Sequence, residues 1–202
     1  MKKIITLIAV LLLQFTASVS AASIGPEELI KQTSAKVLDT LEKNKVLYDQ
    51  EPDKIYQLVD DIILPHLDFK AMSQLALGKH WRDASEEQKD AFTEVFKTML
   101  IRTYSKSLTE YTGQTVEYLP FRAQDDDKVV TVKTQIKQDS GPAIPIDYRL
   151  RLKDDIWKVF DIKIDGISLV TNYRNSFAAD IREVGINGLI QRMNDKYKKT
   201  ST

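Results

Sequence analysis

The chain contains no cysteine, which excludes structural disulfide bonds and thiolate metal sites. Basic and acidic residues are equal in number, 29 of each, so there is no surplus of positive charge of the kind that nucleic-acid binding requires. A Gly-x-Ser-x-Gly turn, a glycine-rich phosphate loop and a His-Glu-x-x-His pair are also missing. These absences give little support to an enzyme, a metalloprotein or a nucleic-acid-binding protein.

Long apolar runs are missing too, except at the very start of the chain. Residues 4–13 are almost all apolar, follow two lysines and precede the small residues 17–22. The run is too short to span a bilayer, which takes about 20 residues, and this order of zones is typical of a secretory signal peptide. We therefore predict a signal peptide over residues 1–22, cleaved after Ala21 or Ala22. Since no cysteine follows to carry a lipid, the product is expected to be soluble in a bacterial periplasm.

The remaining residues, 23–202, suit one domain with a single core. Neither a low-complexity linker nor an internal repeat divides them. Loss of the two N-terminal lysines leaves a net charge of about −2. The basic end of the chain, from about residue 196, is predicted to be a flexible tail.

Helical periodicity dominates the first half of this domain, where apolar residues recur at spacings of three and four. The apolar face of the first predicted helix is interrupted by the polar pair Thr33 and Ser34. Proline suits the first turn of a helix, aspartate caps it, and proline or glycine ends it. The signals that bound the first three helices are Pro26, Asp53 with Pro65, and Asp68 with Gly78.

The clearest helix prediction begins at a capping box, Ser85 to Gln88, in which each side chain bonds the backbone of the other. A broad and unusually aromatic apolar stripe then continues for about seven turns, until Gly113 supplies a stop. We expect this long helix to lie across the concave side of a sheet.

After Gly113 the apolar period changes to two, with polar residues between, which is typical of antiparallel strands with one buried face. A change of phase at Val159 and Phe160 indicates a β-bulge. The chain returns to helix from about Ser168, with a break at residues 185–188. The four predicted strands cover 116–118, 130–136, 144–152 and 157–164.

Helices, then an antiparallel meander, then helices again indicate an α+β fold. We predict a strongly curved four-stranded antiparallel sheet with helices packed on its concave face.

Candidate catalytic and metal-binding residues are few. His66 and His80 have no neighbouring carboxylate or nucleophile in the sequence, and we interpret both as structural or surface residues. The run 125–127 of three aspartates lacks the ligand spacing of a calcium loop and is predicted to be a solvated hairpin. Asp161 and Asp165 lie near a strand-to-helix junction, where helix capping or pairing with arginine is favoured over service as a catalytic base.

The apolar stripes leave two interpretations open. Most of their residues suit an ordinary core. However, Tyr104, Leu108 and Tyr111 extend the stripe to the far end of the long helix, and aromatic residues also alternate inward on the sheet. Tyrosine and tryptophan combine an apolar body with a polar tip, which suits the rim of a pocket.

Several segments together resemble the MlaC family of periplasmic phospholipid-binding proteins, which are also described as toluene-tolerance factors. No single segment is diagnostic, but their order and spacing match over about residues 25–195. The segments are Val59 to Phe69, Leu77 to Trp81, Ser85 to Gln88, Tyr104 to Leu119, Pro145 to Leu150 and Trp157 to Val170.

The resemblance implies a curved sheet related to the NTF2-like and cystatin-like shapes, with a cavity for phospholipid tails between sheet and helices. It implies a carrier, not an enzyme, that shuttles phospholipid between the outer and inner membranes to maintain outer-membrane lipid asymmetry, without a cofactor. The implied partners are an inner-membrane ABC transporter with a ring-forming substrate-binding subunit and an outer-membrane lipoprotein complex. A monomer is expected.

On this basis we predict which apolar residues line the cavity, with Gly78 and Gly166 as candidate hinges. Two alternatives stay open: an envelope adaptor that docks on a transporter without carrying lipid, and a secreted NTF2-like enzyme with Asp161 or Asp165 as its base. The predicted lipid-binding residues are Phe69, Leu75, Phe92, Phe96, Met99, Leu100, Tyr104, Leu108, Tyr111, Tyr118, Val130, Val132, Ile146, Tyr148, Leu150, Trp157, Val159, Val170, Tyr173 and Phe177.

Overall fold

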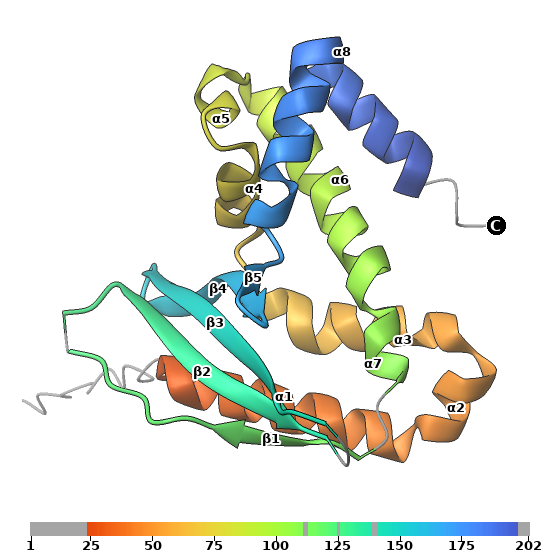
Figure 1. Cartoon of the computed structure of the whole chain (residues 1–202), viewed down its shortest axis with the longest axis vertical. Helices are drawn as coiled ribbons and strands as arrows, with labels where there is room; N and C mark the ends of the chain where they lie inside the picture. The colour runs from red at the N-terminus through yellow and green to blue at the C-terminus, as the bar shows by residue number, and fades with distance from the viewer. Residues whose placement is uncertain (1–23, 111–112, 125, 139–140, 198–202) are drawn as a thin grey trace, which may run out of the picture.

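The computed structural model describes residues 24–110, 113–124, 126–138 and 141–197. The predicted signal peptide, Tyr111, Asp125 and the end of the predicted tail lie outside the described residues. The rest forms an α+β fold, as predicted from the sequence (Figure 1).

The sheet is an antiparallel meander in which every strand pairs with the next along the chain. It has five strands, so the prediction of four strands is wrong. The fifth strand has two residues and follows a tight turn in which Asp165 and Gly166 both have positive φ, and two residues are too few to show an alternating pattern. The strands are β1 Thr115–Tyr118, β2 Val129–Lys137, β3 Ile144–Lys153, β4 Ile156–Ile164 and β5 Ile167–Ser168.

The predicted bulge is confirmed in β4. Leu150 pairs with Val159, whereas the preceding residue of β3, Arg149, pairs with Asp161, so that Phe160 has no partner across the strand. The extra residue restores the alternation beyond it: Val159 and Ile162 both point to the inner face of the sheet.

The helical elements begin and end close to the predicted signals. Asp68 caps α4 by accepting a hydrogen bond from the backbone N–H of Ala71, and the capping box of Ser85 and Gln88 opens α6. The helices are α1 Pro26–Lys43, α2 Lys45–Gln50, α3 Ile55–Leu58, α4 Phe69–Leu77, α5 His80–Asp83, α6 Glu86–Tyr104, α7 Lys106–Thr109 and α8 Arg174–Tyr197.

Short irregular helices complete the picture. A 3₁₀ turn precedes α3, and α3 continues into a π-helical segment, Val59–Ile63, and then into a 3₁₀ turn, Leu64–His66. Gly185 breaks α8 with a φ of 70°, which confirms the predicted break and divides the helix into two arms.

The long aromatic helix does not cover the sheet, and it is shorter than predicted. It ends at Tyr104, and α7 follows after Ser105. Its inner face packs against α4 and α8, whereas α1 lies along the inner face of the sheet (Figure 1). The aromatic stripe thus serves helix–helix packing: Phe92 stacks on Phe96, and both meet Phe177 of α8 edge-on.

Three separate apolar clusters hold the fold together. The first, the helical core, joins α4, α5, α6 and α8 around Phe92 and Phe96. The second, the corner core, joins α1, α2, α3 and the π-helical segment around Ile55. The third, the sheet core, joins α1 to β2, β3 and β4 around Leu150. None of the helices in the described ranges has the length and apolar character needed to cross a membrane.

Candidate functional site

A cavity of about 410 Å³ lies where the three apolar clusters meet. The helical core contributes Met72 and Leu100 to its wall, the corner core contributes Val37 and Val59, and the sheet core contributes Val159. The volume falls within the range of small-molecule binding sites.

The sheet forms one wall through its inner-facing residues. Ile146 of β3 and Ile164 of β4 face one another across the strands, as do Tyr148 of β3 and Ile162 of β4, and Ile136 of β2 also lines the cavity. These positions alternate with the charged outer-facing residues, because successive side chains of a strand point to opposite faces. The alternation that predicts a buried face therefore also supplies the cavity wall.

The opposite wall comes from α1 and from the irregular segment that follows α3. Thr33, Ser34 and Leu38 point into the cavity from α1. Ile63 and Leu64 reach it from the end of the π-helical segment and the 3₁₀ turn after it. π-helical segments are rare in proteins, and many of those that occur lie at functional sites. Their extra residue per turn moves side chains off the regular helical face.

The few polar groups of the wall are hydroxyls and one imidazole. The hydroxyl of Tyr148 interacts with the side chains of Ser34 and Thr134, and burial raises its pKa to about 12. Thr134 in turn donates to the backbone carbonyl of Ile146 at 3.2 Å. The hydroxyl of Tyr148 therefore stays neutral at physiological pH.

Seven of the predicted lining residues lie on the cavity wall. They come from α4, the second half of α6, α7 and the inner face of the sheet. They are Phe69, Leu100, Tyr104, Leu108, Ile146, Tyr148 and Val159.

The other predicted residues that the structure describes are packed in the helical core and the sheet core, away from the cavity wall. Leu75, Phe92, Phe96, Met99, Val170, Tyr173 and Phe177 belong to the helical core. Tyr118, Val130, Val132, Leu150 and Trp157 belong to the sheet core. Tyr111 lies outside the described residues. Contact of any of these residues with lipid stays a prediction.

Sequence reasoning missed the contribution of α1 and of His66. One signal was present, because a core-facing helix has no reason to interrupt its apolar face with Thr33 and Ser34, and both residues line the cavity. His66, interpreted from the sequence as a structural or surface residue, also lines it. His80 does not lie on the wall, and its Nε2 has no hydrogen-bond partner among the residues that the structure describes.

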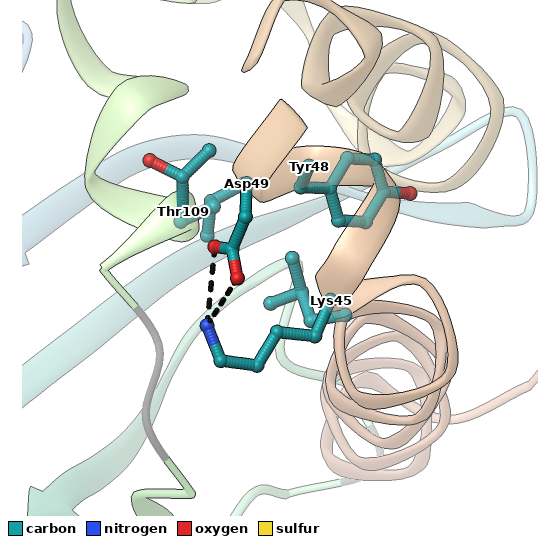
Figure 2. Close-up of a pocket in the computed structure, with 6 residues that line it drawn as sticks. Lys45, Tyr48, Asp49 and Thr109 are labelled. Atoms are coloured by element: carbon teal, nitrogen blue, oxygen red, sulfur yellow. Dashed lines mark hydrogen bonds and ion pairs between the residues drawn. The ribbon is translucent and has the colours of Figure 1, made fainter. Parts of the chain in front are cut away.

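A second, much smaller pocket of about 10 Å³ lies between α2 and α7. Figure 2 shows the ion pair beside it, in which the ammonium of Lys45 lies 2.9 and 3.1 Å from the two carboxylate oxygens of Asp49. Leu108 lines this pocket as well as the large cavity. The small pocket has room for about one water molecule. Of these two spaces, only the large cavity, on the other side of Leu108, can therefore hold a larger ligand.

The candidate catalytic base is engaged elsewhere. Asp161 is 1% exposed; it accepts a hydrogen bond of 2.6 Å from the hydroxyl of Ser168 and pairs with Arg149 at 3.4 Å. Asp165 is exposed in the turn before β5. Neither carboxylate lines the cavity, and within the described ranges no three histidine or acidic residues come together as a metal site.

Comparison with known proteins identifies the family. A model of the MlaC protein family matches residues 31–195. The chain belongs to the MlaC family. The resemblance seen in the sequence is thereby confirmed.

Two relatives align with most of the chain. The toluene tolerance protein ttg2D of Pseudomonas putida is 30% identical over 167 residues, which cover 82% of this chain and 77% of that protein. The intermembrane phospholipid transport system binding protein MlaC of Haemophilus influenzae is 24% identical over 197 residues, which cover 96% and 92%.

A solved structure shares the fold. The phospholipid-binding protein of Ralstonia solanacearum, determined in complex with a phospholipid, is 35% identical and superimposes with a TM-score of 0.80. The similarity covers 89% of this chain and all of that one.

Proposed function

We propose that this protein is a phospholipid carrier that holds the acyl chains of one lipid in the cavity between its three cores. The observation that carries the proposal is the cavity of about 410 Å³ with its largely apolar wall. Membership of the MlaC family and the likeness to a structure solved with a phospholipid support it.

The physical need for such a carrier follows from the hydrophobic effect. A phospholipid has roughly 30 methylenes and burying each is worth about 0.8 kcal/mol, so its passage through water faces a barrier on the order of 20 kcal/mol. A protein that offers an apolar lining lowers this barrier without making or breaking a bond. We therefore infer a carrier without catalytic activity and without a cofactor, in which phospholipid is the cargo.

We further propose that the protein works in the periplasm and moves phospholipid between the outer and inner membranes, which maintains outer-membrane lipid asymmetry. The inner-membrane ABC transporter complex and the outer-membrane lipoprotein complex are the proposed partners. The relative from Haemophilus influenzae, which is named as the binding protein of an intermembrane phospholipid transport system, supports this assignment. Kinship of the curved sheet with NTF2-like and cystatin-like shapes stays a prediction.

Native mass spectrometry of the protein purified from cells tests the binding step. We expect one phospholipid per chain, retained through gentle desolvation. A chain that arrives bare and takes up no lipid from vesicles would favour the adaptor alternative.

Transfer between vesicles tests the carrier step. Donor vesicles contain a fluorescent phospholipid with a quencher, and acceptor vesicles contain neither. We expect the protein to speed the recovery of fluorescence in proportion to its concentration. Binding without any acceleration would mean that the protein stores lipid but does not carry it.

The enzyme alternative predicts that Asp161→Asn abolishes a turnover of the bound lipid. We expect the lipid recovered from wild-type protein to be intact, and its amount per chain to be the same in the variant. Hydrolysed lipid from the wild type and intact lipid from the variant would instead support a catalytic role.

A further inference from the structure

His66 stands out among the residues of the cavity wall. It is one of two histidines in the chain, and it lies in the 3₁₀ turn Leu64–His66 at the edge of the cavity. Its side chain is partly exposed, so it belongs both to the wall and to the surface. A neutral imidazole there offers one N–H donor and one acceptor.

Two lysines exert a positive charge on His66, Lys158 from beside its turn and Lys36 from α1. The ammonium of Lys158, on β4, donates a hydrogen bond to the backbone carbonyl of Pro65. Lys36, on α1, directly precedes Val37, a residue of the cavity wall. Both positive charges act on His66: together with burial, which is the largest cause, they hold the pKa of its imidazole below the ordinary value.

Neither lysine is neutralised by a carboxylate within the part of the chain that the structure describes. This sets them apart from Lys31, Lys43 and Lys45, which all pair with an acidic residue one turn away.

The acidic residues nearest in the sequence to Lys36 and to His66 are occupied. Asp39, three residues after Lys36, pairs with Lys43 at 2.8 Å. Asp68, two residues after His66, accepts hydrogen bonds from Arg151 and from the first turn of α4. The edge of the cavity at His66 therefore carries two uncompensated positive charges.

We propose that Lys36, His66 and Lys158 form a subsite for the phosphate of the lipid head group, at the edge of the cavity that holds the acyl chains. The proposal rests on the proposed function. A phosphodiester carries one negative charge and accepting oxygens, and lysine binds such groups as a point charge. The partly exposed site removes little water from these charges, so the desolvation cost that penalises buried ion pairs is small.

The subsite makes a specific statement about selectivity. It recognises the phosphodiester that glycerophospholipids share, and none of its three side chains requires a particular alcohol beyond the phosphate. The protein should therefore distinguish a phospholipid from diacylglycerol with the same acyl chains, which lacks the phosphate, and should discriminate weakly among phospholipid head groups.

The test measures the affinity of lipid-free protein for phosphatidylglycerol and for diacylglycerol with identical acyl chains, by displacement of a fluorescent fatty-acid probe. We expect the double variant Lys36→Gln/Lys158→Gln to bind phosphatidylglycerol roughly tenfold more weakly, since two partly exposed charge contacts are lost. Its affinity for diacylglycerol should not change. The matched control is Lys133→Gln/Lys163→Gln, which removes the same charge from the outer face of the sheet and should change neither affinity.

A second measurement follows the imidazole of His66 by NMR. We expect its pKa to rise when phosphatidylglycerol is bound, because a nearby negative charge favours the protonated form. Diacylglycerol should not produce this rise. Besides the two lysines, the charged neighbours in the sequence are Asp61, Asp68 and Lys70; Asp61 accepts a hydrogen bond from Gln57, Asp68 is held by Arg151, and the ammonium of Lys70 lies 4.0 Å from a carboxylate oxygen of Glu86.

Equal losses for both lipids in the double variant, or no loss for either, would overturn the subsite while leaving the carrier intact. Wild-type protein that binds neither lipid would instead sink the proposed function itself. Inorganic phosphate distinguishes a lipid head group from a free anion, because it has no acyl chain to anchor it. Displacement of bound phosphatidylglycerol by millimolar inorganic phosphate would contradict a head-group site, and its failure to displace the lipid is the expected result.

Discussion

The hydroxyl oxygens of Tyr104 and Tyr173 lie 3.2 Å apart and join the end of α6 to the 3₁₀ turn Thr171–Tyr173 that leads into α8. Tyr104 lines the cavity, whereas Tyr173 stacks on Phe177 in the helical core. The contact between the two hydroxyls therefore lies on the boundary between the cavity and the helical core. Burial and this hydrogen bond raise the pKa of Tyr104 above its ordinary value, so its hydroxyl stays neutral at physiological pH.

This relationship predicts strong coupling between the two tyrosines. Tyr104→Phe and Tyr173→Phe should each lower the free energy of unfolding by about 1 kcal/mol, because each leaves the other hydroxyl without its partner. The double variant should lose little more than either single variant. Denaturant unfolding in a double-mutant cycle measures the coupling, and strictly additive losses would show that the hydroxyls do not depend on each other.

The separation of core from cavity predicts a second pattern. Phe96 is fully buried in the helical core and does not line the cavity. Phe96→Ala should therefore lower the free energy of unfolding by about 3–5 kcal/mol, yet leave lipid occupancy unchanged in the protein that remains folded at low temperature. Denaturant unfolding and native mass spectrometry measure the two effects. A specific loss of lipid without loss of stability would move Phe96 from the core to the binding site.

Filling the cavity should have the opposite effect. Leu108→Trp and Tyr148→Trp place a larger side chain on the wall, and the small pocket behind Leu108 is too small to take it. We expect lipid occupancy to fall in both variants while the far-UV circular dichroism spectrum stays that of a folded chain. Leu47→Trp, on the exposed face of α2, is the matched control and should bind lipid normally. Unchanged occupancy in both cavity variants would contradict the assigned wall.

The pKa of His66 makes stability depend on pH. The folded state lowers this pKa below the unfolded value of about 6.5, so the unfolded chain binds more protons between the two values. The stability associated with neutral His66 is therefore fully present above about pH 6.5 and is lost as the pH falls through the folded pKa. His66→Gln should flatten this part of the profile in thermal unfolding of lipid-free protein between pH 5 and 7.5, and an unchanged pH dependence would contradict it.

The local structure of this protein is largely predictable from its sequence. Strict alternation predicts β2, β3 and β4, and the change of phase at Val159 and Phe160 predicts the bulge that the pairing shows. Caps act within a few residues, which explains why Asp68 and the Ser85–Gln88 box mark helix starts correctly. The two-residue strand β5 is too short to leave a pattern.

The placement of the helices is less predictable, because an apolar stripe does not say what covers it. The aromatic face of α6 suits a sheet or another helix equally, and it packs on α8. The side chains that face a cavity and those that face a core are chemically alike, so Tyr148 and Leu150, two positions apart on one strand, end in different places. In the sequence, only the polar pair Thr33 and Ser34 distinguishes a cavity-facing position from a core-facing one.

The most direct test of the central claim locates the acyl chains themselves. The protein is loaded with a phospholipid that has a photoreactive diazirine near the end of one acyl chain, and the complex is irradiated. Peptide mass spectrometry then maps the residues that carry lipid adducts. The account predicts adducts on the cavity wall, at residues such as Leu100, Ile101 and Ile162. Adducts confined to the outer face of the sheet or to the surface of α8, with none on the cavity wall, would contradict it.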